Sequence, residues 1–542
     1  MFALALGCVS DDGAADGDAG AGTVGPTDTD SDPSATGPGS GGSGVVDETG
    51  EPVPEIVPAR GVRISLVEAN SGVAVPIGTD NEWVGASGRN APLPKNRDTA
   101  IRVYVDVDEA VWVQRDIEAV LHLYLPDGTE ETLSETVTIA ADSSQTSLQS
   151  GFLFGALAEF MVPGVEYQVE LLEVGDGWQD LPEPATPPLS PAEPGFVGIE
   201  DADLEMKVVM VPVDYTGPGC SRMVDVSDET LARYENAMYQ MNPLASIDLQ
   251  WGPTYVVNDL DLSNPNDFFT LLDRAVQLRA QAAPDPNVYY YVLFDNCGEC
   301  IGSGGCVLGV APGLADDSMG AATFRAAIGT QFLGGSEVGI ETFVHEVGHN
   351  QGRAHVACPG GGAAGPDVSY PYENGGTGVW GFGVRDFQFR NPSTHTDYMS
   401  YCNPTWVSDW QWNATYDRIR TLTSWDAADM SMPEDQAVLV GMINPQTGQA
   451  SWFTERAYIA DSVQRPQGHS LRFMAGDQLI DQAQVQVEAW SEGPGFTVRA
   501  PLPAGYDDEV TAIEYVAPER SFAAPRSAVS TYHRPDALTN AQ

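Results

Sequence analysis

The sequence predicts a multidomain α+β protein in which two β-rich regions flank a central region that mixes strands and helices. Three observations lead to this class. Residues 55–195 alternate apolar and polar positions over short stretches, residues 196–430 alternate strand-like with helix-like stretches, and residues 431–542 return to short strand-like stretches. A chain of 542 residues has room for roughly two to four domains.

The first 54 residues predict export rather than a folded domain. Residues 1–8 form an apolar run that ends in Gly7 and Cys8, which resembles the end of a bacterial lipoprotein signal, where the cysteine receives a lipid. Residues 9–54 are rich in Asp, Gly, Ser, Thr and Pro and contain neither Lys nor Arg. Such a segment cannot bury enough apolar surface to fold, so we expect a flexible acidic tether. The predicted location is the outer membrane, the cell surface or the medium, with a lipid on Cys8 as the only membrane contact.

Residues 55–195 predict an antiparallel β-sandwich without a catalytic constellation. An apolar run over residues 120–125 stops at the turn formed by residues 126–128. Short strands with regular turn signals are typical of sandwiches, and a Pro-rich stretch at residues 181–194 marks the end of this domain. Apolar and polar residues alternate over residues 62–66, 101–105 and 167–171.

Residues 196–430 predict an α/β domain with a mixed sheet. Ser227 is a good N-cap for a helix that runs to about residue 240, because its hydroxyl can accept from an unpaired amide of the first turn. Beyond residue 431, apolar stretches predict a small C-terminal β domain. The other expected elements are strands over residues 204–213, 247–251, 288–294, 437–443 and 485–489, and helices over residues 267–280 and 409–425.

Six cysteines between residues 220 and 402 predict disulfide bridges. An even number within one exported domain is typical of a disulfide framework, and six cysteines allow 15 connectivities. The spacing of Cys297 and Cys300 also fits a zinc knuckle, but the sequence holds no second such pair. We therefore expect structural bridges rather than a cysteine metal site. The six are Cys220, Cys297, Cys300, Cys306, Cys358 and Cys402.

One eleven-residue segment carries the pattern H-E-x-x-H-x-x-G-x-x-H and predicts a catalytic metal site. His345 and His349 are four residues apart, so they share one helix face and can bind one ion. Gly352 can adopt the left-handed conformation that ends a helix, and this turn would return His355 as a third ligand. Three imidazoles leave a fourth position for water, which is typical of catalytic zinc, and Glu346 lies beside it as a candidate general base.

A second segment, residues 397–402, reads Asp-Tyr-Met-Ser-Tyr-Cys. Together with the long histidine pattern it resembles the metzincin clan of zinc endopeptidases, in which a tight turn places a Met beneath the metal. The resemblance implies that Met399 is this Met and is not a ligand. It also implies that Tyr401 is the tyrosine that some members use as a fifth ligand or as a donor to the transition state. The acidic tether and the β domain look like those of large secreted bacterial lipoprotein metzincins.

The resemblance implies hydrolysis of peptide bonds in extracellular proteins or glycoproteins by a monomer. One Zn²⁺ on His345, His349 and His355 would lower the pKa of its water toward ~7. Glu346 would take the proton of that water and deliver it to the leaving amine. Zinc, with Tyr401, would stabilise the developing oxyanion.

Three further expectations concern the surroundings of the implied site. A bridge between Cys358 and Cys402 would tie the chain after the histidine motif to the Met-turn, and the other four cysteines would pair among themselves. The aromatic residues of segment 370–387 either line a substrate cleft or fill the lower core. The β domain before residue 200 has no cysteine that could block the metal, whereas an acidic residue could still do so.

The net charge of −52 excludes some partners and leaves others open. So acidic a surface repels phosphate backbones and anionic lipid headgroups, so we expect no nucleic acid and no membrane-surface partner. A catalytically silent metzincin scaffold, acting as a surface adhesin or glycan-binding lipoprotein, is the alternative function. The presence of Glu346 argues against it, because a silent scaffold does not need that carboxylate. A purely structural zinc is a third possibility, against which the open fourth position argues.

Overall fold

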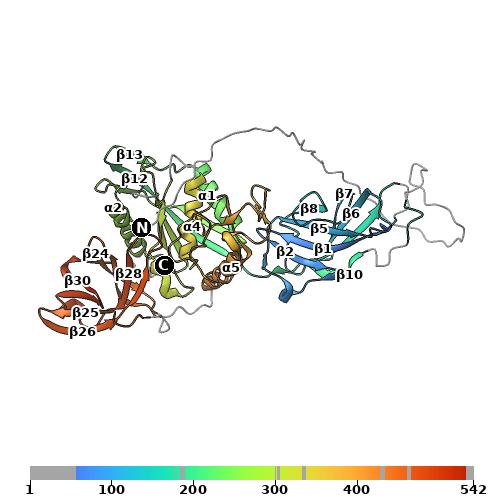
Figure 1. The fold of residues 1–542 in the computed structure, drawn as a ribbon. Coiled ribbons are helices and arrows are strands. Elements are labelled where there is room, and N and C mark those ends of the chain that lie inside the picture. Colours follow the sequence, from blue (N-terminus) through green and yellow to red (C-terminus); the bar gives the residue numbers. More distant parts are fainter. Residues whose placement is uncertain are drawn as a thin grey trace, which may run out of the picture.

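The computed structural model describes residues 57–175, 178–182, 189–299, 301, 306–331, 337–427, 434–459 and 465–532. The chain is multidomain and mostly β with few helices. Three regions follow one another along the long axis of the molecule, in the order of the sequence from blue to red in Figure 1. The predicted signal remnant, residues 1–8 with Cys8, and the acidic tether, residues 9–54, lie outside the described residues.

The N-terminal region consists of two antiparallel sheets with the strand orders β3-β2-β1-β5-β8 and β10-β9-β6-β7. In β6 every second residue from Ile117 to Leu123 is fully buried, because successive side chains of a strand point to opposite faces. The strands are β1 Val62–Asn70, β2 Ala74–Thr79, β3 Glu82–Trp83, β5 Thr99–Val107, β6 Arg115–Tyr124, β7 Glu130–Ile139, β8 Phe152–Ala156, β9 Glu166–Glu173 and β10 Leu189–Phe196.

The central region is built on a mixed sheet with the path β13-β12-β16-β18-β17, in which β14 and β15 also pair with β12. Strands β12, β16 and β18 are parallel, and β17 runs antiparallel to β18 at the end of the path. The strands are β12 Glu205–Gly217, β13 Cys220–Met223, β14 Ser246–Trp251, β15 Tyr255–Val257, β16 Val288–Phe294, β17 Gly309–Val310 and β18 Ala326–Thr330. The helices are α1 Asp228–Met241, α2 Pro265–Ala282, α4 Glu337–Asn350 and α5 Asp409–Thr423.

Helices cover both faces of this sheet. Tyr291 and Leu293 of β16 belong to the core that contains α1 and α4, whereas Val292 and Phe294 belong to the core that contains α2. The period of two along β16 therefore assigns α4 and α2 to opposite faces. The helix predicted after Ser227 is confirmed, since the side chain of Ser227 accepts from the amide at the third helical position. The other elements predicted here also appear, with ends shifted by a few residues, as element boundaries usually are.

The C-terminal region adds two more sheets, with the orders β27-β28-β23-β24-β31 and β26-β25-β29-β30. Val440 of β23 and Phe453 of β24 share an apolar core with Leu272 and Val276 of α2, so this region packs on the α2 face. Its elements are β23 Gln436–Asn444, β24 Gln449–Ala457, β25 Ser470–Ala475, β26 Gln478–Gln484, β27 Gln486–Ala489, β28 Phe496–Pro501, α6 Tyr506–Glu509, β29 Ala512–Ala517, β30 Arg520–Pro525 and β31 Val529–Thr531.

Short strand pairs complete the fold. Strands β21 and β22 pair in parallel and bracket the predicted Met-turn. The pairs are β4 Leu93–Pro94 with β11 Ile199–Glu200, β19 Gly381–Phe382 with β20 Phe389–Arg390, and β21 Thr396–Asp397 with β22 Thr405–Trp406.

Two of the expected disulfides can be assigned. Cys358 and Cys402 form the predicted bridge, and Cys220 is joined to Cys297. Cys306 is also disulfide-bonded, while Cys300 lies outside the described residues. Bridges of this kind are typical of exported proteins. In the described part of the chain, none of the helices has the length and apolar character needed to cross a bilayer.

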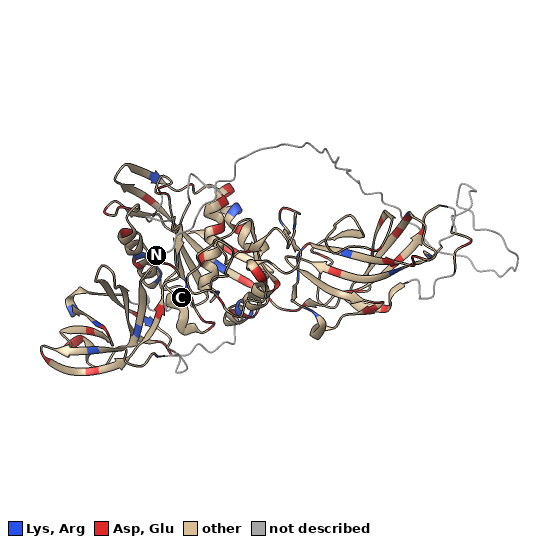
Figure 2. Ribbon diagram, in the orientation of Figure 1, with Lys and Arg blue, Asp and Glu red and all other residues tan. Residues whose placement is uncertain are grey.

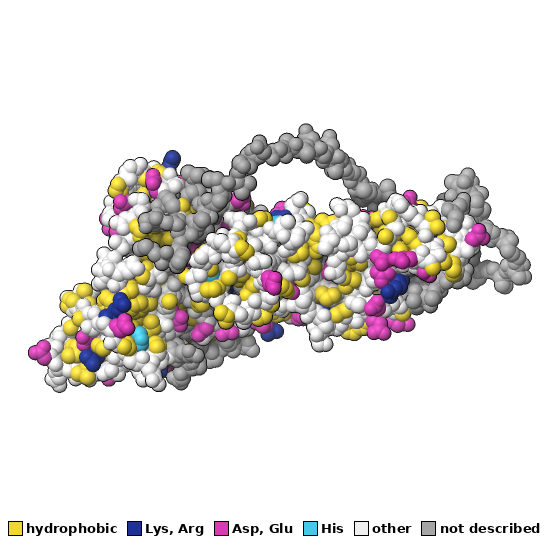
Figure 3. Space-filling view, viewed as in Figure 1, with side chains coloured by type: hydrophobic (Ala, Val, Ile, Leu, Met, Phe, Trp, Pro, Cys, Tyr) yellow, Lys and Arg dark blue, Asp and Glu magenta, His cyan; other side chains and the backbone are white. Residues whose placement is uncertain are grey.

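The acidic character extends over the folded regions. Asp and Glu occur on the strands and helices of all three regions (Figure 2). On the face drawn in Figure 3, acidic side chains likewise lie over each region, with Lys or Arg beside only some of them. The negative charge is therefore a property of the folded surface as well as of residues 9–54.

Candidate metal centre and cleft

Helix α4 carries two of the three motif histidines, and a glycine turn returns the third. His345 and His349 lie one turn apart on the buried face of the helix. The helix ends as predicted, because Gly352 takes the left-handed conformation at a φ of 78° and its amide donates to the carbonyl of His349 (2.8 Å). The chain turns sharply at this point and brings His355 back to the other two rings.

The three imidazoles are held in one tautomer. Each donates its Nδ1–H to a backbone carbonyl, so each Nε2 is left as an acceptor with a free lone pair. The hydrogen bonds join His345 to the carbonyl of Tyr398 (2.9 Å), His349 to that of Arg353 (2.7 Å) and His355 to that of Ala364 (2.7 Å).

The three Nε2 atoms converge on one point. That of His349 lies 3.2 Å from that of His345 and 3.1 Å from that of His355, and all three lie within 4.8 Å of one another. Burial, with a smaller contribution from the neighbouring ring of His355, lowers the pKa of His345 to about 4, and burial lowers that of His349 well below its usual value. Each Nδ1–H already donates to a carbonyl, so the three Nε2 atoms face one another as ligand atoms around a common point. This donor set fits a metal ion.

The predicted Met-turn lies beneath α4. Met399 is fully buried, and a Cβ placed on Gly348 of the helix would lie only 2.5 Å from its Sδ. The amide of Met399 donates to Oδ1 of Asp397 (2.9 Å), and its carbonyl accepts from the amide of Val356 (2.9 Å). The turn is thereby fixed against the segment that follows His355, and Met399 supports the centre without offering it a ligand atom.

Glu346 faces the same space from the next position of α4. Its side chain is only 3 % exposed, and its Oε2 accepts from the hydroxyl of Ser491 (3.2 Å). Burial, followed by the negative charge of Glu492, raises the pKa of Glu346 well above its usual value. A divalent cation beside it would act in the opposite direction, because a nearby positive charge favours the carboxylate.

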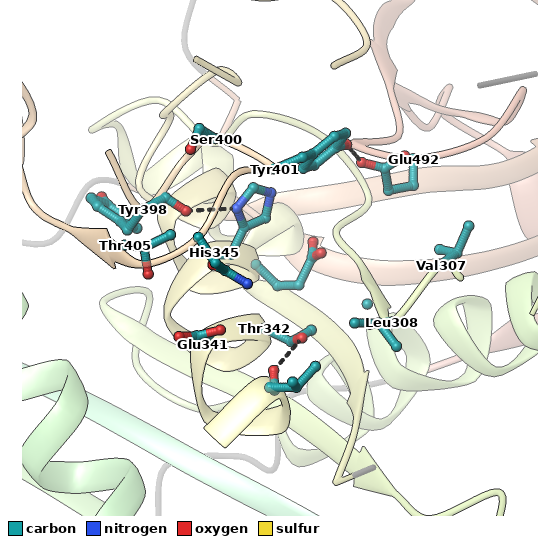
Figure 4. A pocket seen from close by; sticks show the side chains of 14 residues that line it. Val307, Leu308, Glu341, Thr342, His345, Tyr398, Ser400, Tyr401, Thr405 and Glu492 are labelled. Carbon is teal, nitrogen blue, oxygen red and sulfur yellow. Dashed lines mark hydrogen bonds between the residues drawn. The ribbon is translucent and has the colours of Figure 1, made fainter. Parts of the chain in front are cut away.

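Tyr401 lies beside His355 and lines the cleft. Its hydroxyl is 2.9 Å from Nε2 of His355. It is also hydrogen-bonded to Oε1 of Glu492 (Figure 4). The same Oε1 lies 3.1 Å from Nε2 of His355. Burial and the charge of Glu492 raise the pKa of Tyr401 above its usual range, so the phenol keeps its proton.

A cleft with a cavity volume of about 100 Å³ opens beside the centre (Figure 4). This is room for several water molecules. Its lining comes from residues 307–309, which lead into β17, from the first turns of α4, from the Met-turn and from Glu492. Glu341 of α4 adds a carboxyl group to this lining, and burial raises its pKa.

The aromatic segment between the histidine motif and the Met-turn does not line this cleft. The indole of Trp380 donates to the carbonyl of Gln145 in the N-terminal region (2.6 Å), and the ring of Phe382 packs on that of Phe389. The cleft beside the histidines is thus not lined by this segment, and packing describes Trp380 and Phe382, whereas Phe387 is exposed.

Sequence reasoning missed Ser491 and Glu492. Both lie in the loop between β27 and β28, just before Gly493 and Pro494. These two residues signal a turn, but nothing in the local sequence connects that turn with a histidine motif more than a hundred positions earlier.

Comparisons with known proteins place the chain in no family. No family model and no curated protein matches it. Two of the solved structures with some similarity are a calcium-binding mutant of β-glucuronidase 2 from Bacteroides uniformis and a putative β-galactosidase from Bacteroides fragilis. Both are 10% identical with a TM-score of 0.12, over 43% and 88% of this chain and 27% and 74% of theirs. This chain therefore spans about a quarter of the glucuronidase, and a likeness this low carries no argument.

Proposed function

We propose that the chain is a zinc-dependent endopeptidase of the metzincin type. The observation that carries the proposal is the convergence of three imidazole nitrogens beside Glu346 and a cleft. Three histidines are a usual donor set for catalytic zinc, and they leave further positions for water and substrate. The glycine turn and the buried Met399 support the placement of the catalytic region in this clan.

The chain's own residues have distinct roles in this proposal. A zinc ion held by the three histidines would supply Lewis-acid activation of a water and of the substrate carbonyl. Glu346 would accept the proton of the attacking water and pass it to the leaving amine. The phenol of Tyr401 would donate a hydrogen bond to the oxygen that becomes negative in the transition state. The backbone carbonyls on each Nδ1–H would hold the rings in the orientation that this requires.

The edge strand β17 supports a peptide as the substrate. It ends the mixed sheet and passes close to α4, since a Cβ on Gly309 would lie 2.6 Å from Cγ of Glu346. An extended peptide that pairs with a sheet edge gains backbone hydrogen bonds regardless of its sequence. A peptide added here would pass directly by Glu346 and the histidines.

The test compares Glu346→Gln with the wild type. We expect cleavage of casein or of a peptide library to fall by at least about 10²-fold, while the zinc content stays at one ion per chain. Glu337→Gln is the matched control. It replaces a Glu by Gln in the first turn of the same helix, where the side chain is exposed. Glu492→Gln is tested beside the wild type, because Glu492 lies against His355 and Tyr401 at the centre. If both proteins hold zinc and neither cleaves any substrate, the proposal is contradicted and the silent scaffold is favoured.

Location and anchoring remain part of the proposal. The disulfides support an exported protein, and the lipid on Cys8 follows from the sequence alone. Metabolic labelling with a radioactive fatty acid should label the wild type and not Cys8→Ser. Label retained in that variant would contradict the anchor.

A further inference from the structure

The loop between β27 and β28 brings the C-terminal region into the metal centre. Two adjacent residues of this loop touch three groups that the proposed reaction uses. The hydroxyl of Ser491 donates to Oε2 of Glu346 (3.2 Å), and Oε1 of Glu492 is hydrogen-bonded to Tyr401 and lies 3.1 Å from Nε2 of His355. The contact is therefore with the reacting groups themselves and not with the rim of the cleft.

The loop is held firmly in this position. Trp490 is buried, its ring lies 5.3 Å from that of Phe269 on α2, and its indole donates to Thr497 (3.1 Å). The amide of Ser491 donates to the carbonyl of Ala311 (2.9 Å), and the amide of Ala311 donates back to the Ser491 hydroxyl (2.8 Å). These partners lie on α2, on β28 and directly after β17, so the loop is held from several sides.

These contacts resemble those expected of a bound peptide. Ala311 directly follows β17, so its hydrogen bonds with Ser491 continue the edge strand in the way a substrate would. The carboxylate of Glu492 lies beside His355 and Tyr401, where a substrate carbonyl must lie to reach both. A carboxylate oxygen is also a ligand that zinc accepts.

We propose that the Ser491–Glu492 turn is an intramolecular inhibitor of the metal centre. Glu492 competes with substrate for the cleft side of the three Nε2 atoms, and Ser491 ties down the carboxylate of Glu346. The inference rests on the proposed function, because it concerns regulation of the same site. Trp490 belongs to the core shared with α2, so activation requires displacement of the turn alone and not release of the C-terminal region.

A supporting role for Glu492 in the reaction would require different contacts. A residue that positions Tyr401 from behind would leave the metal-facing side of the centre free. Glu492 instead contacts the hydroxyl of Tyr401 and the metal-facing nitrogen of His355 with one and the same oxygen. The geometry therefore points to competition with substrate.

The test uses binding of a small metal ligand, so that it does not depend on peptidase activity. The full-length protein is loaded with Co²⁺, whose visible spectrum reports its ligands, and is titrated with acetohydroxamate. We expect Glu492→Gln to bind acetohydroxamate at least about tenfold more tightly than the wild type, which corresponds to a cleft that is open in no more than about one wild-type molecule in ten. Cleavage of peptides should rise by a similar factor.

Glu519→Gln is the matched control, since Glu519 is exposed at the turn between β29 and β30 of the same region. It should bind acetohydroxamate as the wild type does. Glu492→Ala serves as a second variant should Glu492→Gln fold poorly. Equal affinity in wild type and Glu492 variants that hold one Co²⁺ would overturn the inhibitor and leave the proposed function intact. Failure of every form to bind Co²⁺ would overturn both.

Discussion

The two β regions that flank the central region are each built from two sheets, yet only one of them reaches the histidines (Figure 1). The N-terminal region shares an apolar core with the central region and adds a buried cation at the end of a helix, away from the histidines. The C-terminal region shares an apolar core with α2, and its buried Arg499 donates to the carbonyl of Gly320. It also places the carboxylate of Glu492 at the histidines, so this attachment alone bears on the proposed reaction.

Arg97 is the centre of the N-terminal attachment. It is 1 % exposed, and its guanidinium donates to the carbonyls of Ser71, Tyr239 and Leu244 (2.9 Å each) and lies over the ring of Trp412 of α5. Two of these carbonyls lie at the end of α1 or just beyond it, where helices leave unpaired acceptors and favour a positive charge. The cation therefore acts as a helix cap supplied by another region.

Trp490 is the apolar anchor of the C-terminal loop that reaches the histidines. Its contacts are with the ring of Phe269 and with the apolar core around α2. An apolar anchor adds no charge beside the metal centre, so the carboxylate of Glu492, two residues later, is the charged group that this loop brings there. Both β regions therefore fasten their interfaces with a buried arginine, Arg97 in one and Arg499 in the other, but only the C-terminal region also brings a charged side chain to the histidines.

The largest expected effect is that of Arg97→Ala. Removing the guanidinium leaves several buried carbonyls without donors, which should lower the free energy of unfolding by about 3–5 kcal/mol. Co²⁺ binding by the folded protein should not change, because no contact of Arg97 involves the metal centre. Chemical denaturation followed by Trp fluorescence measures the first quantity. The control is Arg63→Ala, whose exposed ion pairs should contribute less than about 1 kcal/mol. Equal effects of the two substitutions would contradict the capping role.

A somewhat smaller effect is expected for Trp490→Ala, with a different signature. Truncating a buried Trp costs about 3 kcal/mol, and the loss of the anchor should also free the Ser491–Glu492 turn. Stability should fall while the affinity for acetohydroxamate rises, a combination that Arg97→Ala cannot produce. A fall in stability with unchanged affinity would show that the backbone bonds to Ala311 suffice to hold the turn.

The sequence predicts the histidine cluster well because its signals are local. The spacing of His345 and His349 fixes their common helix face, and Gly352 marks the turn that returns His355. Ser227 likewise announces α1, since capping depends on neighbouring residues only. Each of these predictions depends on residues only a few positions apart, and the structure contains each predicted feature.

The contacts between regions could not be predicted in this way. Ser491 lies 145 residues from Glu346, and Arg97 lies 142 residues from Tyr239. A Ser-Glu pair in a turn, or one Arg in a β domain, has the composition of any solvated surface. The partners become neighbours only when whole regions pack together, and the apolar periodicity of single strands and helices carries no information about that packing. The position of Trp380 could not be predicted for the same reason, because its ring lies against Arg102 of β5 and its indole donates to Gln145, both in the N-terminal region.

The smallest effect concerns the C-terminal interface alone and depends on pH. Asp273 of α2 accepts hydrogen bonds from Gln277 (2.8 Å) and from Ser451 of β24 (3.0 Å), and burial raises its pKa to about 6. Because the unfolded value is near 3.8, the folded chain holds this proton more tightly. The corresponding stability is fully present below pH 4 and is lost as the pH rises through 6. Asp273→Asn should therefore raise the free energy of unfolding by roughly 1–2 kcal/mol at pH 7.5 and leave it unchanged at pH 4. Denaturation curves at the two pH values measure the difference. A gain at both would assign the effect to packing rather than to charge, and the interface would then be as insensitive to ionisation as its apolar core suggests.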